Sequence, residues 1–174
     1  MTYHEYKNAL EKDRARYARK SHLLSYILYP GYKIIVNYRR CRLFQENKLA
    51  YPLYMLQRVR YNRLCVKYGC DIPSHTTIGA GFRIDHPVGV VINSQARIGD
   101  NVTVKSGVVI GDTFKGTPII GDNVLFGVHA IVIGPVKVGK NVIIGAGSVV
   151  TKNIESDSVY CGVPAKKIKS VLIG

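Results

Sequence analysis

The sequence predicts a mainly β fold, a parallel β-solenoid built from six-residue repeats, with a short α-helical segment in front of it. Apolar residues recur every six positions in three runs between Ile72 and Val150. Glycine directly follows most of them, and β-branched residues, which favour strands, dominate the repeated positions. These positions are Ile72, Ile78, Ile84, Ile92, Ile98, Val104, Ile110, Ile120, Phe126, Val132, Val138, Ile144 and Val150.

A six-residue unit is too short for a helical hairpin, but it suits a short strand and a tight turn in which glycine supplies the turn geometry. Three such units make one coil, so each inward side chain should stack on its equivalent about 18 residues further on. A helix is disfavoured, because glycine recurring this often would cost about 1 kcal/mol each time. The thirteen repeated positions therefore predict a little over four coils around one core.

Residues 1–70 differ in composition from the rest of the chain. They hold 15 of the 25 Lys and Arg, 4 of the 11 acidic residues and 11 of the 12 tyrosines. The stretches Tyr3 to Leu28 and Tyr51 to Tyr68 predict two or three amphipathic helices packed on the first coil, interrupted at Pro30-Gly31 and Pro52. We therefore expect a basic, Tyr-rich helical segment at 1–70 and a solenoid domain with a C-terminal tail at 71–174.

The formal charge of +14 does not make the whole chain basic, because most of the excess positive charge lies in the helical segment. Interleaved Tyr and Lys/Arg fit peripheral contact with an anionic membrane, contact with an anionic polysaccharide, or a solvated cap on the solenoid. No nucleic-acid motif accompanies the charge, so no nucleic-acid partner is expected.

No secretory signal or apolar run long enough to cross a membrane is present, which predicts a cytoplasmic protein, with the inner face of the membrane as an alternative location. The cysteines Cys41, Cys65, Cys70 and Cys161 match no zinc or redox spacing, and they are expected to be free thiols. His4 and His22 have no companions at ligand spacing, so no metal is expected.

The six-residue period breaks at two places, and these breaks are the candidate functional loops. The spacing is eight between Ile84 and Ile92 and ten between Ile110 and Ile120. A solenoid gains no stability from leaving its register, and loops on a rigid scaffold commonly carry binding and catalytic residues. The first break contains Asp85-His86-Pro87, and the second contains residues 112–117, Asp-Thr-Phe-Lys-Gly-Thr.

His86 is the candidate general base for acetyl transfer from a thioester to a hydroxyl. The reaction needs a group that takes the hydroxyl proton as the oxygen attacks, and neutral imidazole suits this role. A carboxylate that orients the imidazole assists it. Asp85 is a poor partner, because successive side chains on a strand point to opposite faces. Asp71 lies fourteen residues earlier, near one coil once the break is counted, and it is the better candidate.

Three stretches of the chain resemble the serine acetyltransferase branch of the left-handed β-helix acyltransferases. They are DIPSHTTIGAGFRIDHPVGVVI, IIGDNVLFGVHAIVIGPVKVGKNVIIGAGSVV and CGVPAKKI, and they span Asp71 to Ile168. The resemblance implies a left-handed coil, acetyl-CoA as cosubstrate and a homotrimer with active sites between neighbouring prisms. It also implies that His86 is the catalytic base, that Asp71 orients it and that Asp85 contacts the acceptor.

The resemblance also implies where acetyl-CoA binds. The pantetheine arm is expected along the groove between subunits, and lysines beyond the last coils are expected to meet the phosphates. The expected pantetheine contacts are Gly111, Val128, Gly145 and Ala146, and the expected phosphate contacts are Lys152, Lys166 and Lys167. A solvated surface is the alternative interpretation of these lysines.

Two departures from the serine acetyltransferase pattern favour a different acceptor. The loop at the second break is shorter, and Gly116-Thr117 stand where the family carries an Arg-His pair that holds the amino acid. The long N-terminal helical domain is replaced by the shorter basic segment. Chains with such a segment resemble the sugar O-acetyltransferases of capsule and exopolysaccharide clusters. We therefore expect a saccharide or lipid-linked saccharide acceptor, contacted by Asp112, Lys115 and Thr117.

Two alternatives stay open. The first is a serine O-acetyltransferase of cysteine biosynthesis, and the second is a non-catalytic solenoid that serves as a scaffold. Two further histidines, His129 and His75, lie inside the regular register and are ranked below His86 as catalytic candidates.

Overall fold

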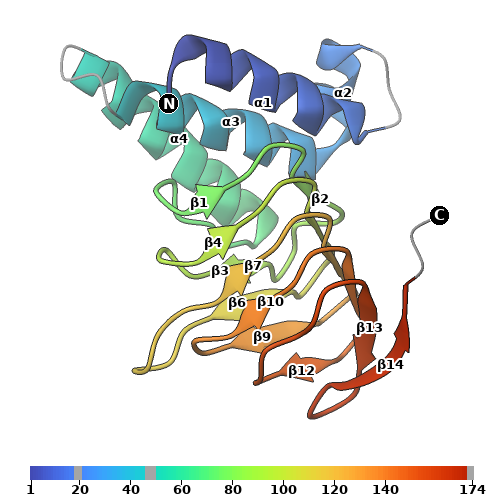
Figure 1. Cartoon of the computed structure of the whole chain (residues 1–174). Coiled ribbons are helices and arrows are strands. Elements are labelled where there is room, and N and C mark those ends of the chain that lie inside the picture. The colour runs from blue at the N-terminus through green and yellow to red at the C-terminus, as the bar shows by residue number, and fades with distance from the viewer. Residues whose placement is uncertain (18–20, 46–49, 172–174) are drawn as a thin grey trace.

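The computed structural model describes residues 1–17, 21–45 and 50–171. It shows a parallel β-solenoid with helices packed over one end (Figure 1). The predicted fold class is therefore confirmed. Residues 18–20, inside the stretch predicted to be helical, lie outside the described residues, as do 46–49 and the chain end at 172–174.

Three sheets form the sides of the solenoid, and their strands pair in parallel except for the last two. One sheet has the order β1-β4-β7-β10, the second β2-β5-β8-β11-β13-β14 and the third β3-β6-β9-β12. The strands are β1 (Thr77–Ile78), β2 (Arg83–Ile84), β3 (Val91–Ile92), β4 (Arg97–Ile98), β5 (Thr103–Val104), β6 (Val109–Gly111), β7 (Ile119–Ile120), β8 (Leu125–Phe126), β9 (Ile131–Ile133), β10 (Lys137–Val138), β11 (Val142–Ile144), β12 (Val149–Val150), β13 (Ser158–Cys161) and β14 (Lys166–Ser170).

The strand register confirms the predicted stacking of inward side chains. Ile78 pairs with Ile98, and Ile98 pairs with Ile120, with all three side chains buried. A regular coil spans 18 residues, as between Leu125 and Ile143. The coil with the first break spans 20, and the coil with the second break spans 22. The two breaks therefore add two and four residues to otherwise regular coils.

Where glycine follows an inward residue it mostly serves close approach between coils and not turn geometry, which corrects the prediction. At Gly99 φ is not positive, and an added Cβ would lie 2.4 Å from Oδ1 of Asp122 in the next coil. The positive φ angles occur further along each turn, at Asn101, Asn123 and Asn141. Asparagine tolerates this conformation well, and the side chain of Asn123 donates to that of Asn141 at 2.9 Å.

The described helices are α1 (Tyr3–Ala15), α2 (His22–Leu28), α3 (Pro30–Gln45) and α4 (Tyr51–Tyr68). The sequence did not predict α3, because Pro30-Gly31 was interpreted as an interruption. Proline is well suited to the first position of a helix, where its missing N–H forms no helical hydrogen bond. Gly31 permits contact with the solenoid, since a Cβ there would lie 2.1 Å from the carbonyl oxygen of Ile84. No described helix has the length and apolar character needed to cross a membrane.

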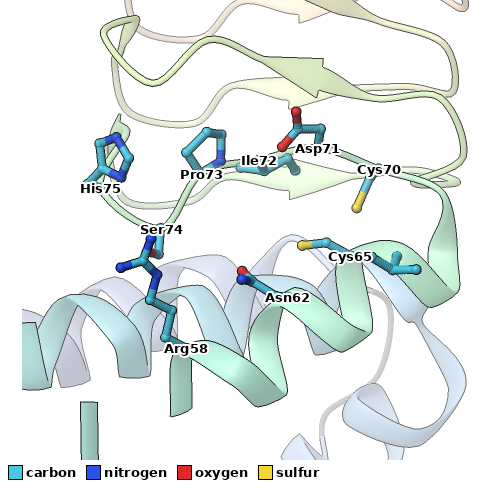
Figure 2. A pocket seen from close by; sticks show the side chains of 10 residues that line it. Arg58, Asn62, Cys65, Cys70, Asp71, Ile72, Pro73, Ser74 and His75 are labelled. Carbon is cyan, nitrogen blue, oxygen red and sulfur yellow. The ribbon is translucent and has the colours of Figure 1, made fainter. Parts of the chain in front are cut away.

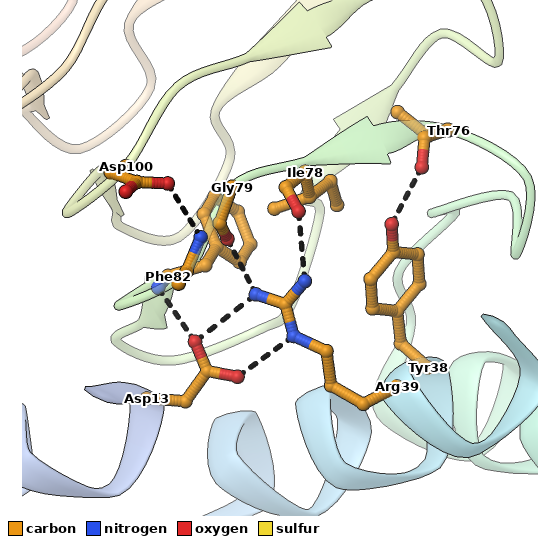
Figure 3. Close-up of polar contacts among 9 residues, drawn as sticks. Asp13, Tyr38, Arg39, Thr76, Ile78, Gly79, Phe82 and Asp100 are labelled. Carbon is orange, nitrogen blue, oxygen red and sulfur yellow. Dashed lines mark hydrogen bonds and ion pairs between the residues drawn. The ribbon is translucent and has the colours of Figure 1, made fainter. Parts of the chain in front are cut away.

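Tyrosines and an ion pair join the helices to the open edge of the first coil (Figure 3). Tyr38 of α3 donates to the carbonyl oxygen of Thr76 at 2.6 Å, and Tyr61 of α4 donates to that of Ile72 at 2.6 Å. An unpaired edge coil would leave such backbone groups without partners. The phenols of Tyr38 and Tyr61 therefore cap backbone groups of the first coil.

The ion pair between Asp13 of α1 and Arg39 of α3 is fully buried at this junction. Arg39 donates from Nε to Asp13 at 2.9 Å and from Nη1 to the carbonyl oxygen of Ile78 at 2.8 Å. Asp13 also accepts from the backbone N–H of Phe82 at 2.9 Å. Burial raises the pKa of the Asp13 carboxyl, and the nearby guanidinium opposes that shift. The pair therefore ties two helices to the first coil.

Candidate active site

His86 lies at the corner between β2 and β3, in the loop lengthened by two residues. Its φ is 58°, in the left-handed region that histidine adopts more readily than most residues, and its side chain is exposed. The loop is anchored on both sides by backbone hydrogen bonds, from Asp85 to Val104 at 2.9 Å and from Gly89 to Gly69 at 2.7 Å. The imidazole is thus held outward on a well-supported turn.

A cavity of about 580 Å³ opens between this corner and the helices. Its solenoid wall includes His86, Pro87 and Val128, and its helical wall includes Leu28 and the first residues of α3. The complete lining is Tyr17, Leu28, Tyr29, Pro30, Gly31, Arg83, Ile84, Asp85, His86, Pro87, Lys105 and Val128. An exposed imidazole beside a cavity of this size is the arrangement that a general base acting on a small acceptor requires.

Charged and phenolic groups around the cavity hold the strand that precedes His86. Arg83 pairs with Asp85 at 2.7 Å and donates to the carbonyl oxygen of Arg16 at 2.8 Å. The hydroxyl of Tyr17 accepts from the backbone N–H of Ile84 at 3.1 Å and donates to its carbonyl oxygen at 3.4 Å. Burial raises the pKa of the Tyr17 phenol, which keeps it neutral and able to make both bonds. Asp85 therefore faces the cavity as part of an ion pair.

Asp71 is placed in the coil next to His86, but within the described residues no hydrogen bond or ion pair joins their side chains. The backbone N–H of Asp71 donates to the carbonyl oxygen of Val90 at 2.8 Å, which sets it beside the strand that follows the His86 loop. Asp71 is among the residues around a different cavity, of about 430 Å³, between α4 and the first coil, and its carboxylate points away from α4 (Figure 2). Arg58 and His75 line that second cavity too. The role of Asp71 as orienting group stays a prediction.

The second break forms a hairpin at another corner, between the third sheet and the first. Thr113 and Gly116 exchange backbone hydrogen bonds of 3.0 and 2.9 Å, and Phe114 at the tip is 97% exposed. The predicted acceptor contacts Asp112, Lys115 and Thr117 do not line the cavity beside His86. One chain by itself does not bring the two breaks together, because a full side of the prism separates them.

The predicted pantetheine contacts fall on two corners. Val128, Gly145 and Ala146 follow the corner of His86 in later coils, where the N–H of Gly147 donates to the carbonyl oxygen of Val128 at 2.8 Å. Gly111 ends β6 at the corner of the second break. Among the predicted phosphate contacts, Lys167 is paired with Glu155 at 2.8 Å, whereas Lys152 and Lys166 are exposed.

His129 shares the corner of His86 but not its cavity lining. Its φ is 57°, and it stands where the neighbouring coils have Gly107 and Gly147. Over the described ranges, no group of three or more His, Cys, Asp or Glu side chains could hold a metal ion.

The cavity residues that sequence reasoning missed include Tyr17, Arg83 and Lys105. Lys105 follows the inward residue Val104 just as Asp85 follows Ile84, so its position in the repeat was the available signal. Tyr17 carried no such signal, because its partner lies 67 residues away.

Comparisons with known proteins agree with this geometry. A family model described as the hexapeptide repeat of succinyl-transferase matches residues 119–152. A serine acetyltransferase of Bacillus pumilus is 37% identical over 155 residues, covering 87% of this chain and 70% of the relative. One from Staphylococcus aureus is 44% identical over 146 residues, covering 79% and 68%. The chain belongs to the serine acetyltransferase family.

A crystal structure of the Neisseria gonorrhoeae serine acetyltransferase superposes on the chain with a TM-score of 0.82 at 28% identity, covering 98% of this chain and 67% of that one. The same enzyme in complex with serine gives a TM-score of 0.81 at 27% identity, covering 96% and 70%. Serine acetyltransferases can be longer than this chain, which spans 58% of a Synechococcus elongatus relative and 40% of one from Arabidopsis thaliana.

The predicted acyltransferase class and hexapeptide-repeat family are confirmed. The prediction of a saccharide acceptor, and of sugar O-acetyltransferases as nearest relatives, is wrong, because these relatives are serine acetyltransferases. The error came from weighting a short loop and the basic N-terminal segment. The N-terminal segment does not depart from the family's fold, because the superposition on a serine acetyltransferase covers 98% of the chain, helices included.

Proposed function

We propose that the chain is an acetyl-CoA-dependent serine O-acetyltransferase in which His86 is the general base. The observation that carries the proposal is the exposed His86 imidazole beside the cavity under the helices, in a chain of this family. A cavity of about 580 Å³ lies within the range for small-molecule sites, which suits an amino acid better than a polymer.

In the proposed reaction, His86 takes the proton from the serine hydroxyl as its oxygen attacks the thioester carbonyl carbon. The tetrahedral intermediate then expels the CoA sulfur, which receives the proton back from the imidazolium. One C–O bond forms, one C–S bond breaks, and the products are O-acetylserine and CoA. Asp71 is proposed to orient the imidazole once the acceptor and a neighbouring subunit complete the site.

A homotrimer is part of the proposal. The second break lies one full side of the prism away from His86, so a neighbouring subunit is needed to bring Asp112, Lys115 and Thr117 toward the imidazole. Three-fold symmetry suits a three-sided solenoid. The acetyl-CoA contacts near Val128, Gly145 and Ala146 are proposed to follow the same groove, with Gly111, Lys152, Lys166 and Lys167 completing it.

The test is release of free CoA thiol from acetyl-CoA in the presence of L-serine. His86→Asn is the sharpest variant, because asparagine tolerates a φ of 58° and so keeps the turn. We expect kcat to fall by about 10²- to 10⁴-fold, the usual contribution of a general base, with an unchanged circular dichroism spectrum.

The matched control is His75→Asn, which changes an exposed histidine in a regular turn and should keep its rate. The wild-type protein failing to release thiol with L-serine, or His86→Asn retaining full activity, would contradict the proposal. No heat on titrating CoA into the protein would favour the alternative of a non-catalytic scaffold.

A further inference from the structure

Lys105 lies directly beside Asp85 in the next coil and faces the same cavity as His86. The register sets it there: Arg83 pairs with Thr103 and Ile84 with Val104, so the residue after each pair occupies the same corner. Lys105 is half-buried and lines the cavity with the imidazole. Its position is a consequence of stacking, because one coil of 20 residues separates it from Asp85.

The charges around the cavity are not balanced. The guanidinium of Arg83 is neutralised by the carboxylate of Asp85 at 2.7 Å. The side-chain ammonium of Lys105 has neither a hydrogen bond nor an ion pair within residues 1–17, 21–45 and 50–171, and only its backbone carbonyl is bonded, to the N–H of Val108. The first turn of α3 forms another wall, and the start of a helix adds a positive field, although by itself it selects no particular anion. One ammonium group is therefore left facing a cavity that contains the general base.

We propose that Lys105 binds the α-carboxylate of the amino-acid acceptor and makes the site specific for acceptors that carry one. The inference rests on the proposed function and extends it to substrate recognition. An ammonium group donates up to three hydrogen bonds, and its bonds to a carboxylate are stronger than those between neutral groups. The flexible four-carbon stem lets the charge follow an acceptor placed against His86.

The role is one of binding and not of chemistry. The carboxylate keeps its charge from substrate to transition state, so an interaction with it stabilises both equally and acts on KM more than on kcat. Removing the general base should instead act on kcat more than on KM. The two residues can therefore be distinguished in one set of measurements.

The experiment compares Lys105→Met with Lys137→Met, which removes an exposed lysine from the outer face of β10. Both changes delete the charge and keep the apolar stem. For Lys105→Met we expect KM for L-serine to rise by about 10- to 100-fold, as for the loss of a charged hydrogen bond, with kcat changed by less than about 3-fold. KM for L-serinamide, which lacks the carboxylate, should not change, and neither should KM for acetyl-CoA.

A rise in KM that is equal for L-serine and L-serinamide would overturn the inference, and so would a rise in KM for acetyl-CoA alone. Calorimetric titration with L-serine gives a readout that does not depend on turnover. Binding that is lost in Lys105→Met and kept in Lys137→Met supports the inference even if no thiol is released, in which case the proposed function fails and the carboxylate site stands. No binding of L-serine to the wild-type protein, or equal binding to both variants, overturns it.

Discussion

His129 occupies a corner position that glycine fills in the coils on either side. Its ring lies over Gly107, where an added Cβ would be 2.0 Å from the His129 Nδ1 atom. Gly107 has a φ of +68° and Gly147 has a φ of +64°, so both need the left-handed region, but Gly147 has open space around it. Gly107 is therefore needed both for its left-handed conformation and for the space that the His129 ring occupies, whereas Gly147 is needed for its conformation alone.

Gly107→Ala should lower the free energy of unfolding by about 2–4 kcal/mol, because left-handed strain and a steric clash add together. Gly147→Ala is the matched control and should cost only the strain, about 1–2 kcal/mol. Denaturant unfolding at a fixed protein concentration measures both. In a His129→Gly background the cost of Gly107→Ala should fall to the level of Gly147→Ala. An equal cost in both backgrounds would show that the imidazole does not rest on Gly107.

The helices act as a cap for the solenoid, and that role depends on the buried pair between Asp13 and Arg39. The pair joins α1 and α3 to the strand β1 and to the turn before β2 (Figure 3). Gly31 brings α3 against the carbonyl of Ile84, one residue before the Asp85-His86 pair. The cap therefore supports the first coil and also forms one wall of the candidate active site.

Arg39→Met should lower the free energy of unfolding by about 3–5 kcal/mol, because it leaves the carboxylate of Asp13 buried without its partner. Arg97→Met, on the outer face of β4, is the control and should stay within about 0.5 kcal/mol of wild type. Denaturant midpoints at equal protein concentration compare the two. If Arg39→Met unfolds at the wild-type midpoint, the buried pair does not hold the cap.

At the scale of the whole molecule, one side of the prism is apolar along its length. The outward residues of β3, β6, β9 and β12 are Val91, Val109, Ile131 and Val149. The first sheet is more polar, with Thr77, Arg97, Ile119 and Lys137 at the corresponding outward positions. An apolar side that ends at the His86 corner suits the proposed contact between subunits.

Ile131→Glu should convert the proposed trimer to monomers, because it buries an unpaired charge in the centre of that side. Thiol release should be lost with it, since the site is proposed to need two subunits. Sedimentation velocity measures the assembly state. Ile119→Glu, on the outer face of the first sheet, is the control and should stay trimeric. A trimer in Ile131→Glu, or monomers in Ile119→Glu alone, would place the contact on another side.

The sequence by itself determined the solenoid and the size of its two breaks. Spacings of eight and ten in place of six correspond to coils of 20 and 22 residues in place of 18. This was predictable because strand alternation and coil stacking are local: each inward side chain meets its partner a constant distance along the chain. His86 was found the same way, from a break in a local pattern.

Only the tertiary structure decided what surrounds those breaks. Pro30-Gly31 begins a helix because that helix packs on Ile84, and Tyr17 reaches the same strand from 67 residues away. The repeat register places Lys105 beside Asp85, but the helical residues that close the other wall of their cavity come from the distant N-terminal segment. Contacts between residues distant in the chain leave no periodic trace in the sequence. For that reason the fold could be predicted from its period, while the cavity formed between the solenoid and the helices could not.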